Sequence, residues 1–274
     1  MPGKKKNKSK ALTAKTADKY ALYLKSVQSP DYEIDFFNRV FSKAYGRKPV
    51  LMREDFCGTA AVCAAWVRSG DRRAIGVDFD PEPLAWGEKH LRAKLPADRA
   101  KRMKLIEGDV REVGGPRADI VSAQNFATGY FYTREELLDY FKAARGHLKR
   151  EGLLFLDCMG GSETYEDEEE EETEFKGFTY IWNNHNFDPI THRCTYFIHF
   201  EFPDGTRIDR AFRYDWRLWS IPEIRELLAE AGYRDSWVYW ESTDLKTGEG
   251  NGVYRRRESA EADPAWVCYI IGVK

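Results

Sequence analysis

The chain has 274 residues, of which 43 are Lys or Arg and 45 are Asp or Glu, so its formal net charge is −2. Its 42% hydrophobic content excludes a wholly disordered protein, and its balanced charge excludes a protein that binds polyanions over its whole surface. No apolar run reaches the roughly 18 residues that a membrane-spanning helix needs, so we expect no contact with a membrane.

Two local runs of charge depart from this balance. Residues 1–17 are rich in lysine and lack the apolar stretch of a secretory signal, so we expect a disordered basic tail. Residues 163–174 hold nine acidic side chains in twelve positions. Repulsion between them predicts a mobile surface loop, and a lid that attracts cations is the alternative.

Five cysteines, at positions 57, 63, 158, 194 and 268, stand singly in the sequence. They lack the CxxC and His-rich spacings that are typical of zinc sites and the pattern of a disulfide framework. We therefore predict no bound metal, and a reducing cytoplasm is the expected location.

The first two thirds of the chain alternate between helical and strand patterns. A helix is predicted over residues 31–45, where apolar side chains share one face and Gly46 follows. Helices are also predicted over residues 59–69, from Asp80-Pro81 as N-cap and first position, and from the capping box of Thr133 and Glu136. The intervening apolar runs, residues 49–56, 74–77, 104–107, 120–123 and 152–158, are predicted strands, and this alternation indicates a parallel, doubly wound sheet.

A period of two replaces this pattern after the acidic run. Strands are predicted from Phe178, over residues 195–202 and over residues 207–214, with Asp204-Gly205 at a turn. A helix that begins with a capping box of Ser220 and Glu223 is predicted next. Two strands follow, over residues 237–240 and 266–273, and a polar loop that carries three arginines, residues 255–257, joins them. The predicted fold is α/β: a doubly wound Rossmann-like sheet with an antiparallel β insertion. We divide it into a tail (1–17), a core (18–174, including the acidic loop), the insertion (175–219) and the rest of the core (220–274).

The chemistry of such a fold is expected beyond the carboxyl ends of its parallel strands. The sequence EDFCGTA, residues 54–60, occupies this place after the first strand, and Gly58 there lets the backbone approach a ligand. Asp78 ends the second strand 20 residues later, the spacing at which an acid accepts hydrogen bonds from ribose hydroxyls. A nucleoside cofactor is therefore expected. A dinucleotide fingerprint would need glycine at positions 56 and 61, where the chain has Phe56 and Ala61, whereas phosphate-free S-adenosylmethionine does not meet this obstacle.

At these residues the chain resembles the class I S-adenosylmethionine-dependent methyltransferases, in particular small-molecule enzymes with an antiparallel insertion after the fifth strand. The motifs are the loop at 54–60, GVDFDPEPL, LIEGDVRE and SAQNFATGY, within residues 48–160. The resemblance implies that Asp78 binds the ribose diol, that Asp109 and Val110 meet the adenine, and that residues 56–60 face the ribose and methionine portion. The family's first and third loop glycines are Phe56 and Ala60 here. An NPPY-type motif is missing after Asn125, which disfavours methylation of a nucleobase amine.

The predicted binding residues fall into two groups. Arg53 is predicted either to hold the cofactor carboxylate or to pair with Glu54, and Tyr20 or Tyr23 to close over the methyl donor. The predicted cofactor-binding residues are Tyr23, Arg53, Glu54, Phe56, Cys57, Gly58, Thr59, Ala60, Asp78, Phe79, Asp109, Val110, Asn125 and Phe126. The predicted substrate-binding residues, with packing as the alternative for each, are Tyr130, Tyr132, Trp182, Tyr214, Arg217 and Trp219.

Methyl transfer from a sulfonium creates little new charge, so alignment of the two reactants is expected to dominate catalysis. A protonated acceptor would also need a base. The candidates are His185, His192, His199 and Tyr130, with Glu163 or Asp157 near the fifth strand.

The predicted function is methyl transfer to N, O or S of a small molecule enclosed by the aromatic insertion. One alternative is an RNA or protein methyltransferase, favoured by the lysine tail and by residues 255–257, although the acidic run makes nucleic acid an unlikely partner. The other is a module that binds S-adenosylmethionine without catalysis. The sequence gives no prediction of the oligomeric state.

Overall fold

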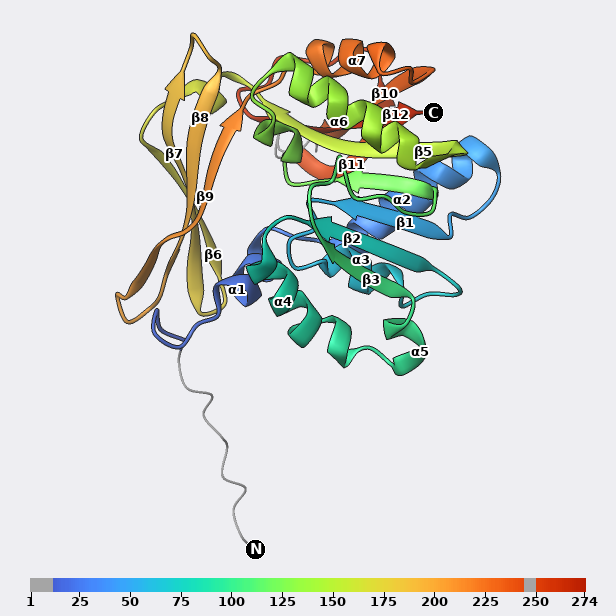
Figure 1. Cartoon of the computed structure of the whole chain (residues 1–274). Helices are drawn as coiled ribbons and strands as arrows, with labels where there is room; N and C mark the ends of the chain where they lie inside the picture. The colour runs from blue at the N-terminus through green and yellow to red at the C-terminus, as the bar shows by residue number, and fades with distance from the viewer. Residues whose placement is uncertain (1–11, 244–249) are drawn as a thin grey trace, which may run out of the picture.

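The computed structural model of the protein describes residues 12–243 and 250–274 and shows two β-sheets side by side (Figure 1). Most of the predicted basic tail, residues 1–11, lies outside the described residues. Among the residues that are described, no helix has the length and the apolar character needed to cross a membrane.

The larger sheet has eight strands in the order β11-β10-β12-β5-β4-β1-β2-β3. Five of them run parallel, as predicted, and β10, β11 and β12 are antiparallel to their neighbours at one side. The parallel strands are β1 (Leu51–Asp55), β2 (Arg73–Asp78), β3 (Met103–Glu107), β4 (Ala118–Ala123) and β5 (Leu148–Gly160). The others are β10 (Asp235–Thr243), β11 (Gly250–Arg257) and β12 (Trp266–Val273).

Helices cover both faces of this sheet, which confirms the doubly wound prediction (Figure 1). They are α2 (Pro30–Tyr45), α3 (Ala61–Trp66), α4 (Pro81–His90), α5 (Ala97–Ala100), α6 (Arg134–His147) and α7 (Ile221–Glu230), with the short 3-10 turns η1 (Arg92–Lys94), η2 (Ala127–Tyr130) and η3 (Ser162–Tyr165). The predicted caps form: Asp80 accepts from the Glu82 N–H at the start of α4, and capping boxes open α6 and α7. These polar side chains satisfy backbone donors that the first turn of a helix leaves free.

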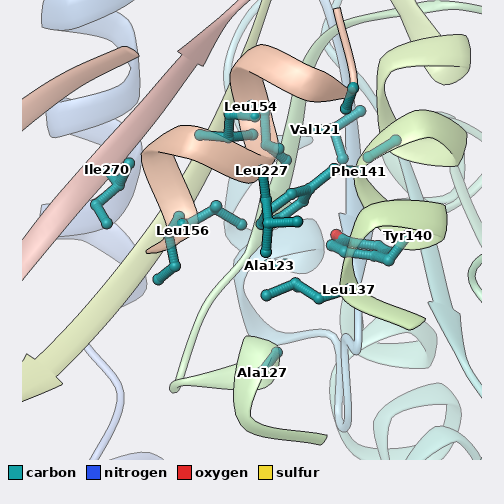
Figure 2. Close-up of a cluster of buried hydrophobic side chains, with 14 of the residues drawn as sticks. Val121, Ala123, Ala127, Leu137, Tyr140, Phe141, Leu154, Leu156, Leu227 and Ile270 are labelled. Atoms are coloured by element: carbon teal, nitrogen blue, oxygen red, sulfur yellow. The ribbon is translucent and has the colours of Figure 1, made fainter. Parts of the chain in front are cut away.

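Alternate residues of the central strands enter two separate cores. On β5, Leu154 and Leu156 pack with α6 and α7, whereas Leu153 and Phe155 pack with α2 and α3. Figure 2 shows the first of these cores, where Leu227 of α7 and Phe141 of α6 lie over the strands. Burial of each such leucine contributes roughly 1.5–3 kcal/mol, so a strand that is apolar on both sides binds both helical layers.

The smaller sheet is antiparallel in the order β6-β7-β8-β9. Its strands are β6 (Glu169–Phe175), β7 (Phe178–Asp188), β8 (Arg193–Glu201) and β9 (Arg207–Arg217). The predicted insertion is therefore present, but the prediction of a loop over residues 163–174 is wrong for its second half, because Glu169 to Glu174 pair with β7. As the edge strand, β6 leaves its carboxylates in water, and this keeps their mutual repulsion small enough for a strand to form.

A second correction concerns the polar segment between the last two predicted strands. Residues 255–257 lie in β11, paired with β10, and not in a loop. Like β6, this strand is at the edge of its sheet, so its arginines remain solvated.

The start of the described chain also differs from the prediction. Residues 12–17, assigned above to a disordered tail, lie against the smaller sheet, where the Ala14 N–H donates to Oγ1 of Thr206 at 3.0 Å. An additional helix, α1 (Lys19–Ser26), follows and lies between this sheet and α4 (Figure 1). Asp18 caps α1 and accepts a hydrogen bond from Nε1 of Trp86 on α4.

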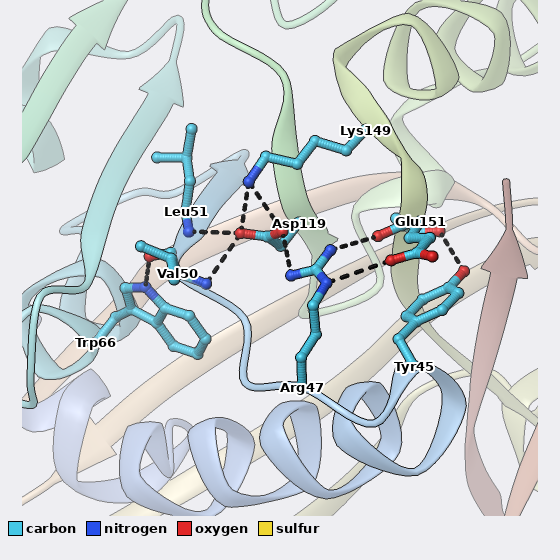
Figure 3. Close-up of polar contacts among 9 residues, drawn as sticks. Tyr45, Arg47, Val50, Leu51, Trp66, Asp119, Lys149 and Glu151 are labelled. Atoms are coloured by element: carbon cyan, nitrogen blue, oxygen red, sulfur yellow. Dashed lines mark hydrogen bonds and ion pairs between the residues drawn. The ribbon is translucent and has the colours of Figure 1, made fainter.

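A buried carboxylate ties the sheet together at the amino ends of its strands (Figure 3). Asp119 on β4 is fully buried and accepts from the backbone N–H groups of Val50 and Leu51, both at 2.9 Å, and from Arg47 and Lys149. Burial alone would raise the pKa of Asp119, but these donors hold that pKa below its ordinary value. The cluster is therefore structural, at the opposite edge of the sheet from the cavities described next.

Candidate functional site

Two cavities lie between the two sheets, beyond the carboxyl ends of the parallel strands. The strand-end cavity, of about 340 Å³, is lined by the loops after β1, β2 and β4, by α1 and by β9. The aromatic cavity, of about 430 Å³, is lined by the smaller sheet, by η3, by the ends of β5 and β12 and by α1. Both have the size of cavities that hold small ligands.

The loop after β1 has an unusual backbone path. Phe56, Gly58 and Ala60 all have positive φ, at 57°, 52° and 58°. Left-handed backbone costs a non-glycine residue roughly 1–2 kcal/mol, so the chain keeps a glycine-like conformation at the two positions where the sequence departs from the family's glycines. The departures at Phe56 and Ala60 therefore change the side chains without straightening the loop.

Asp78 fixes this loop to the end of β2. The Gly58 N–H donates to Oδ2 of Asp78 at 2.7 Å, and the Asp80 N–H donates to Oδ1 at 3.0 Å. Burial raises the pKa of Asp78, and these donors oppose the increase. The cap of α4 is Asp80, as predicted, so Asp78 has no part in capping this helix.

The polar groups of the strand-end cavity fit a nucleoside with a positively charged sulfonium. The carboxylate of Asp78 is available to ribose hydroxyls, and a Cβ at Gly58 would meet no atom within 4 Å. Oγ1 of Thr59 and Oε1 of Gln28 are buried without a hydrogen-bond partner among the described residues. Such unpaired atoms are costly unless a ligand or water completes their bonds. Tyr23 adds an aromatic ring of the kind that attracts cations.

The structure brings most of the predicted cofactor-binding residues to this place. Those that line the strand-end cavity are Tyr23, Phe56, Cys57, Gly58, Thr59, Asp78, Phe79 and Asn125. Phe126 lines the aromatic cavity instead. Their roles toward a ligand remain predictions.

Arg53 does not line either cavity, and the prediction that it holds a cofactor carboxylate is corrected. Its side chain is only 1% exposed; Nε donates to Asp55 at 2.7 Å, and the remaining nitrogens donate to the carbonyls of Val113 and Val110. It pairs with Asp55, and not with Glu54 as the alternative held. The guanidinium is thus fully used inside the core.

Four further predicted cofactor residues lie outside the strand-end cavity. Glu54 accepts from the Cys63 N–H at 2.9 Å and so anchors the start of α3, where Ala60 is fully buried. Asp109 is held by the Arg111 guanidinium, and Val110 is buried in the core. None of the four lines the cavity, and contact between any of them and a cofactor stays a prediction.

Asp157, considered above as a base, positions the segment that separates the cavities. Its two carboxylate oxygens accept from the N–H groups of Asn125 at 2.7 Å and Phe126 at 2.8 Å. Both of these residues have φ of 59°, so the carboxylate stabilises a tight left-handed turn. Burial raises the pKa of Asp157 to about 7, and the two backbone donors oppose this increase.

Strand register explains the lining of the aromatic cavity. Residues directly opposite in an antiparallel sheet share a face. One row across the smaller sheet is Glu169, Asn184, Tyr196 and Tyr214, and the next is Glu171, Trp182, Ile198 and Phe212. All of these except Phe212 line the aromatic cavity, and Phe212 lines the strand-end cavity. The inner face of the insertion therefore forms one wall of the site.

Of the predicted substrate residues, three line a cavity and three do not. Trp182 and Tyr214 line the aromatic cavity and Tyr130 the strand-end cavity. Tyr132 donates its hydroxyl to the Asp215 carbonyl, Arg217 stacks on Trp219 and donates to the Tyr132 carbonyl, and Trp219 donates to the Phe131 carbonyl. These three join the smaller sheet to α6 and α7, as the packing alternative held.

The candidate bases are mostly remote. His185, His192 and His199 line neither cavity. His185 pairs with Glu168, and His199 is buried against Asp209 on the outer side of the sheet. Burial raises the pKa of Tyr130, which makes its hydroxyl a poor base. Glu163 is the one candidate from the predicted set that lines the aromatic cavity.

Sequence reasoning missed several cavity residues. Gln28 is one of these, because it follows α1, which was not predicted. Trp216 belongs to the predicted aromatic insertion, and it continues the alternation of β9 beyond Tyr214. Nε1 of Trp216, in a residue that is 3% exposed, has no hydrogen-bond partner among the described residues.

Comparison with known proteins agrees with this geometry. No family model matches the chain. YqeM of Bacillus subtilis strain 168, which carries a provisional methyltransferase name, is 22% identical over 204 residues, covering 69% of this chain and 76% of YqeM. The ribosomal protein L11 methyltransferase of Yersinia pestis is 27% identical over 111 residues, which are 40% of this chain and only 36% of that enzyme.

Similar solved structures cover nearly the whole chain. An S-adenosylmethionine-dependent methyltransferase from Clostridium acetobutylicum superposes with a TM-score of 0.65 at 17% identity and covers 93% of this chain and 97% of its own. The sugar N-methyltransferase KedS8 from Streptoalloteichus has a TM-score of 0.62 at 19% identity, covering 100% and 98%. The chain has the class I methyltransferase fold. The predicted fold class, including the β insertion, is thus confirmed.

Proposed function

We propose that the protein is an S-adenosylmethionine-dependent methyltransferase that acts on a small molecule. The fold and the strand-end cavity support the cofactor, and the aromatic cavity supplies a place for the acceptor. Cytoplasmic location belongs to the same proposal and is supported by the free, buried state of all five cysteines.

One observation carries the proposal: the two cavities share a wall. Tyr23 of α1, Asn125 after β4 and Tyr214 of β9 line both of them. A donor in one cavity and an acceptor in the other would therefore meet beside these three residues. Holding two reactants in line contributes roughly 7–11 kcal/mol toward a displacement reaction.

Each element has a defined part in this scheme. Asp78 would bind the ribose, the loop at 56–59 the nucleoside, and Tyr23 and Tyr214 the reacting groups. When bound, S-adenosylmethionine would supply an electrophilic methyl carbon to the acceptor lone pair, and its sulfur would keep the electron pair of the broken carbon–sulfur bond. Burial raises the pKa of Tyr23 to about 12, and the neighbouring Tyr214 hydroxyl lowers it, so both phenols stay protonated and act by positioning.

The lining of the aromatic cavity supports a small acceptor and not a nucleic acid. Among its described lining residues there is no Lys, Arg or His, whereas binding of a phosphate backbone depends on such cations. Arg255 and Arg256 lie on β11, which contributes nothing to either cavity.

The test is calorimetric titration with S-adenosylhomocysteine, with NAD as the comparison ligand. We expect binding of the first and not of the second. Asp78→Asn should weaken binding roughly 10- to 100-fold, because a hydrogen bond to a charged acceptor contributes about 1.5–3 kcal/mol.

Glu107→Gln is the matched control. Glu107 lies directly opposite Asp78 on β3 and is exposed, yet it does not line the cavity. The affinity of the Glu107→Gln variant for S-adenosylhomocysteine should equal that of the unaltered protein. Preference for NAD, or equal losses of S-adenosylhomocysteine affinity in the two variants, would refute the assignment of this cavity to the cofactor. Tight binding without transfer of the methyl group from labelled S-adenosylmethionine to any amine, phenol or thiol would favour a non-catalytic module.

A further inference from the structure

The aromatic cavity combines a negatively charged mouth with π-rich walls. Four glutamates line it, Glu163 of η3 and Glu169, Glu170 and Glu171 of β6. Glu170 pairs with Arg207, and the other three have no ion-pair partner among the described residues. Eight aromatic side chains form the walls: Tyr23, Phe126, Tyr180, Trp182, Tyr196, Tyr214, Trp216 and Trp266.

The orientation of the two free strand carboxylates follows from register. Glu171 lies opposite Trp182, and Glu169 lies opposite Asn184, so both carboxylates share the inner face with the cavity wall. Glu172 and Glu174 lie opposite Ile181 and Thr179 and have the other orientation. The charge at the mouth is thus placed by the pairing of β6 and not only by the density of acids.

Trp216, which lines this cavity, offers an independent sign of a ligand. Trp216 is only 3% exposed, and its indole Nε1–H has no acceptor among the described residues. An unmet buried donor costs about 1–3 kcal/mol, so a ligand that brings an oxygen or nitrogen acceptor to this place would be stabilised. Aromatic rings around it attract cations, at roughly 0.5–2 kcal/mol each contact when water is excluded.

We propose that the acceptor is a small organic cation, an amine that is protonated at neutral pH and carried on a flat or apolar body with a hydrogen-bond acceptor. Before transfer this amine has to give up its proton, to Glu163 in the cavity lining or to water, so that the nitrogen has a lone pair for the methyl group. This inference rests on the proposed function, because only a methyltransferase has an acceptor. What it says about the molecule is that the aromatic cavity selects cations. A neutral analogue would lose the attraction of the glutamates and the rings. An anion of similar size would be repelled by the three unpaired carboxylates and would find no cation in the described lining to pair with.

The experiment compares three probes of similar size: 2-phenylethylammonium, 2-phenylethanol and phenylacetate. Each is titrated into the full-length protein at low and at high salt, alone and with S-adenosylhomocysteine present, and tryptophan fluorescence or calorimetry reports binding. We expect the ammonium probe to bind at least about 10-fold more tightly than the alcohol, with no binding of the carboxylate. High salt should narrow the difference, because the glutamates are exposed.

Two double variants separate the mouth from general surface charge. E169Q/E171Q should weaken binding of the ammonium probe by about 2- to 20-fold, as expected for the loss of two exposed charge pairs. Binding of the alcohol should be unchanged. E172Q/E174Q removes the same charge from the other face of the same strand, and it should change the affinity for neither probe. Equal affinity for the three probes, preference for phenylacetate, equal effects of the two double variants, or no binding of any probe would each overturn the inference.

Failure of this inference and failure of the proposed function give different results. If S-adenosylhomocysteine binds but the probes do not discriminate by charge, the cation inference is wrong and the methyltransferase proposal stands. If the ammonium probe binds selectively but S-adenosylhomocysteine does not bind, the cavity selects cations and the methyltransferase proposal is wrong.

Discussion

Glu33 provides the most quantitative test of the structure. It lies on α2, is only 8% exposed, and its Oε2 has no hydrogen-bond partner among the described residues. Burial, and then repulsion from Glu54 and Asp157, raises the pKa of Glu33 from 4.5 to about 8. The folded protein therefore binds this proton more tightly than the unfolded chain does, and the associated stability is complete below pH 4.5 and lost as the pH rises to about 8.

The magnitude follows from the two pKa values. A tenfold change in proton affinity corresponds to about 1.4 kcal/mol, so the full effect of raising the pKa from 4.5 to about 8 is roughly 5 kcal/mol. Glu33→Gln keeps the shape and removes the titration. Relative to the unaltered protein, the variant should gain several kcal/mol in unfolding free energy between pH 5 and pH 9.

Urea denaturation followed by tryptophan fluorescence, repeated across this pH range, measures the difference. Asp35→Asn, an exposed carboxylate on the same helix, is the control and should follow the unaltered protein at every pH. Glu54 and Asp157, whose pKa values burial raises to about 7, contribute to all three proteins. If the unfolding free energies of the Glu33→Gln and unaltered proteins changed in parallel with pH, Glu33 would not lie in the buried, repulsive environment described here.

Three further predictions concern other parts of the chain. Asp119→Ala leaves two backbone N–H groups and two cations without their acceptor, so urea denaturation should show a loss of about 3–5 kcal/mol while S-adenosylhomocysteine affinity is retained. Arg53→Met leaves Asp55 buried without its partner and should cost a similar amount of unfolding free energy; a selective loss of cofactor affinity in a stably folded variant would restore the original prediction for Arg53. Gly129→Ala would place a Cβ 2.7 Å from Cγ of Trp216. Displacement of the indole should weaken binding of the ammonium probe, with unchanged S-adenosylhomocysteine binding, and calorimetric titration of both ligands checks this.

Sequence patterns predicted the elements whose local chemistry is specific. The caps at Asp80, Thr133 and Ser220 form as expected, because a side-chain oxygen before a helical pattern has one favourable partner, the backbone of the first turn. The spacing between Gly58 and Asp78 was interpreted as that of a ribose-binding acid, and this role stays a prediction. The two residues do meet, since the loop after one strand lies at the end of its parallel neighbour.

Runs of one charge were harder to interpret. Residues 163–174 and 255–257 were both assigned to loops, yet β6 and β11 are edge strands. An edge strand satisfies half of its backbone by pairing and leaves its side chains in water, so it needs no apolar face, and charge density alone does not distinguish it from a loop.

Which residues line a cavity depends on which face of its strand each side chain occupies. Sequence spacing gives that face only where the register of the strand is known. Trp182 and Trp219 are equally plausible wall residues in the sequence, but Trp182 lies on the inner face of β7 and Trp219 lies in the core beside α6. The same applies to Arg53, whose strand position suggested the ligand edge. Its side chain instead turns to Asp55 and to carbonyls of the segment after β3.

The contacts of α1 bear on how acceptor specificity could be exchanged between relatives. The Tyr20 and Tyr23 rings pack on Phe212 of β9, with ring centroids 5.7 and 4.9 Å apart, and the Ala14 N–H is bonded to Thr206. Residues 12–26 and the inserted sheet thus form one unit, although some 140 residues of the larger domain separate them in the chain. A chimera that received only the insertion of a related enzyme would place a foreign β9 against the native Tyr23 and disturb the wall common to both cavities. Recombination, in nature or by design, has to move the two segments together.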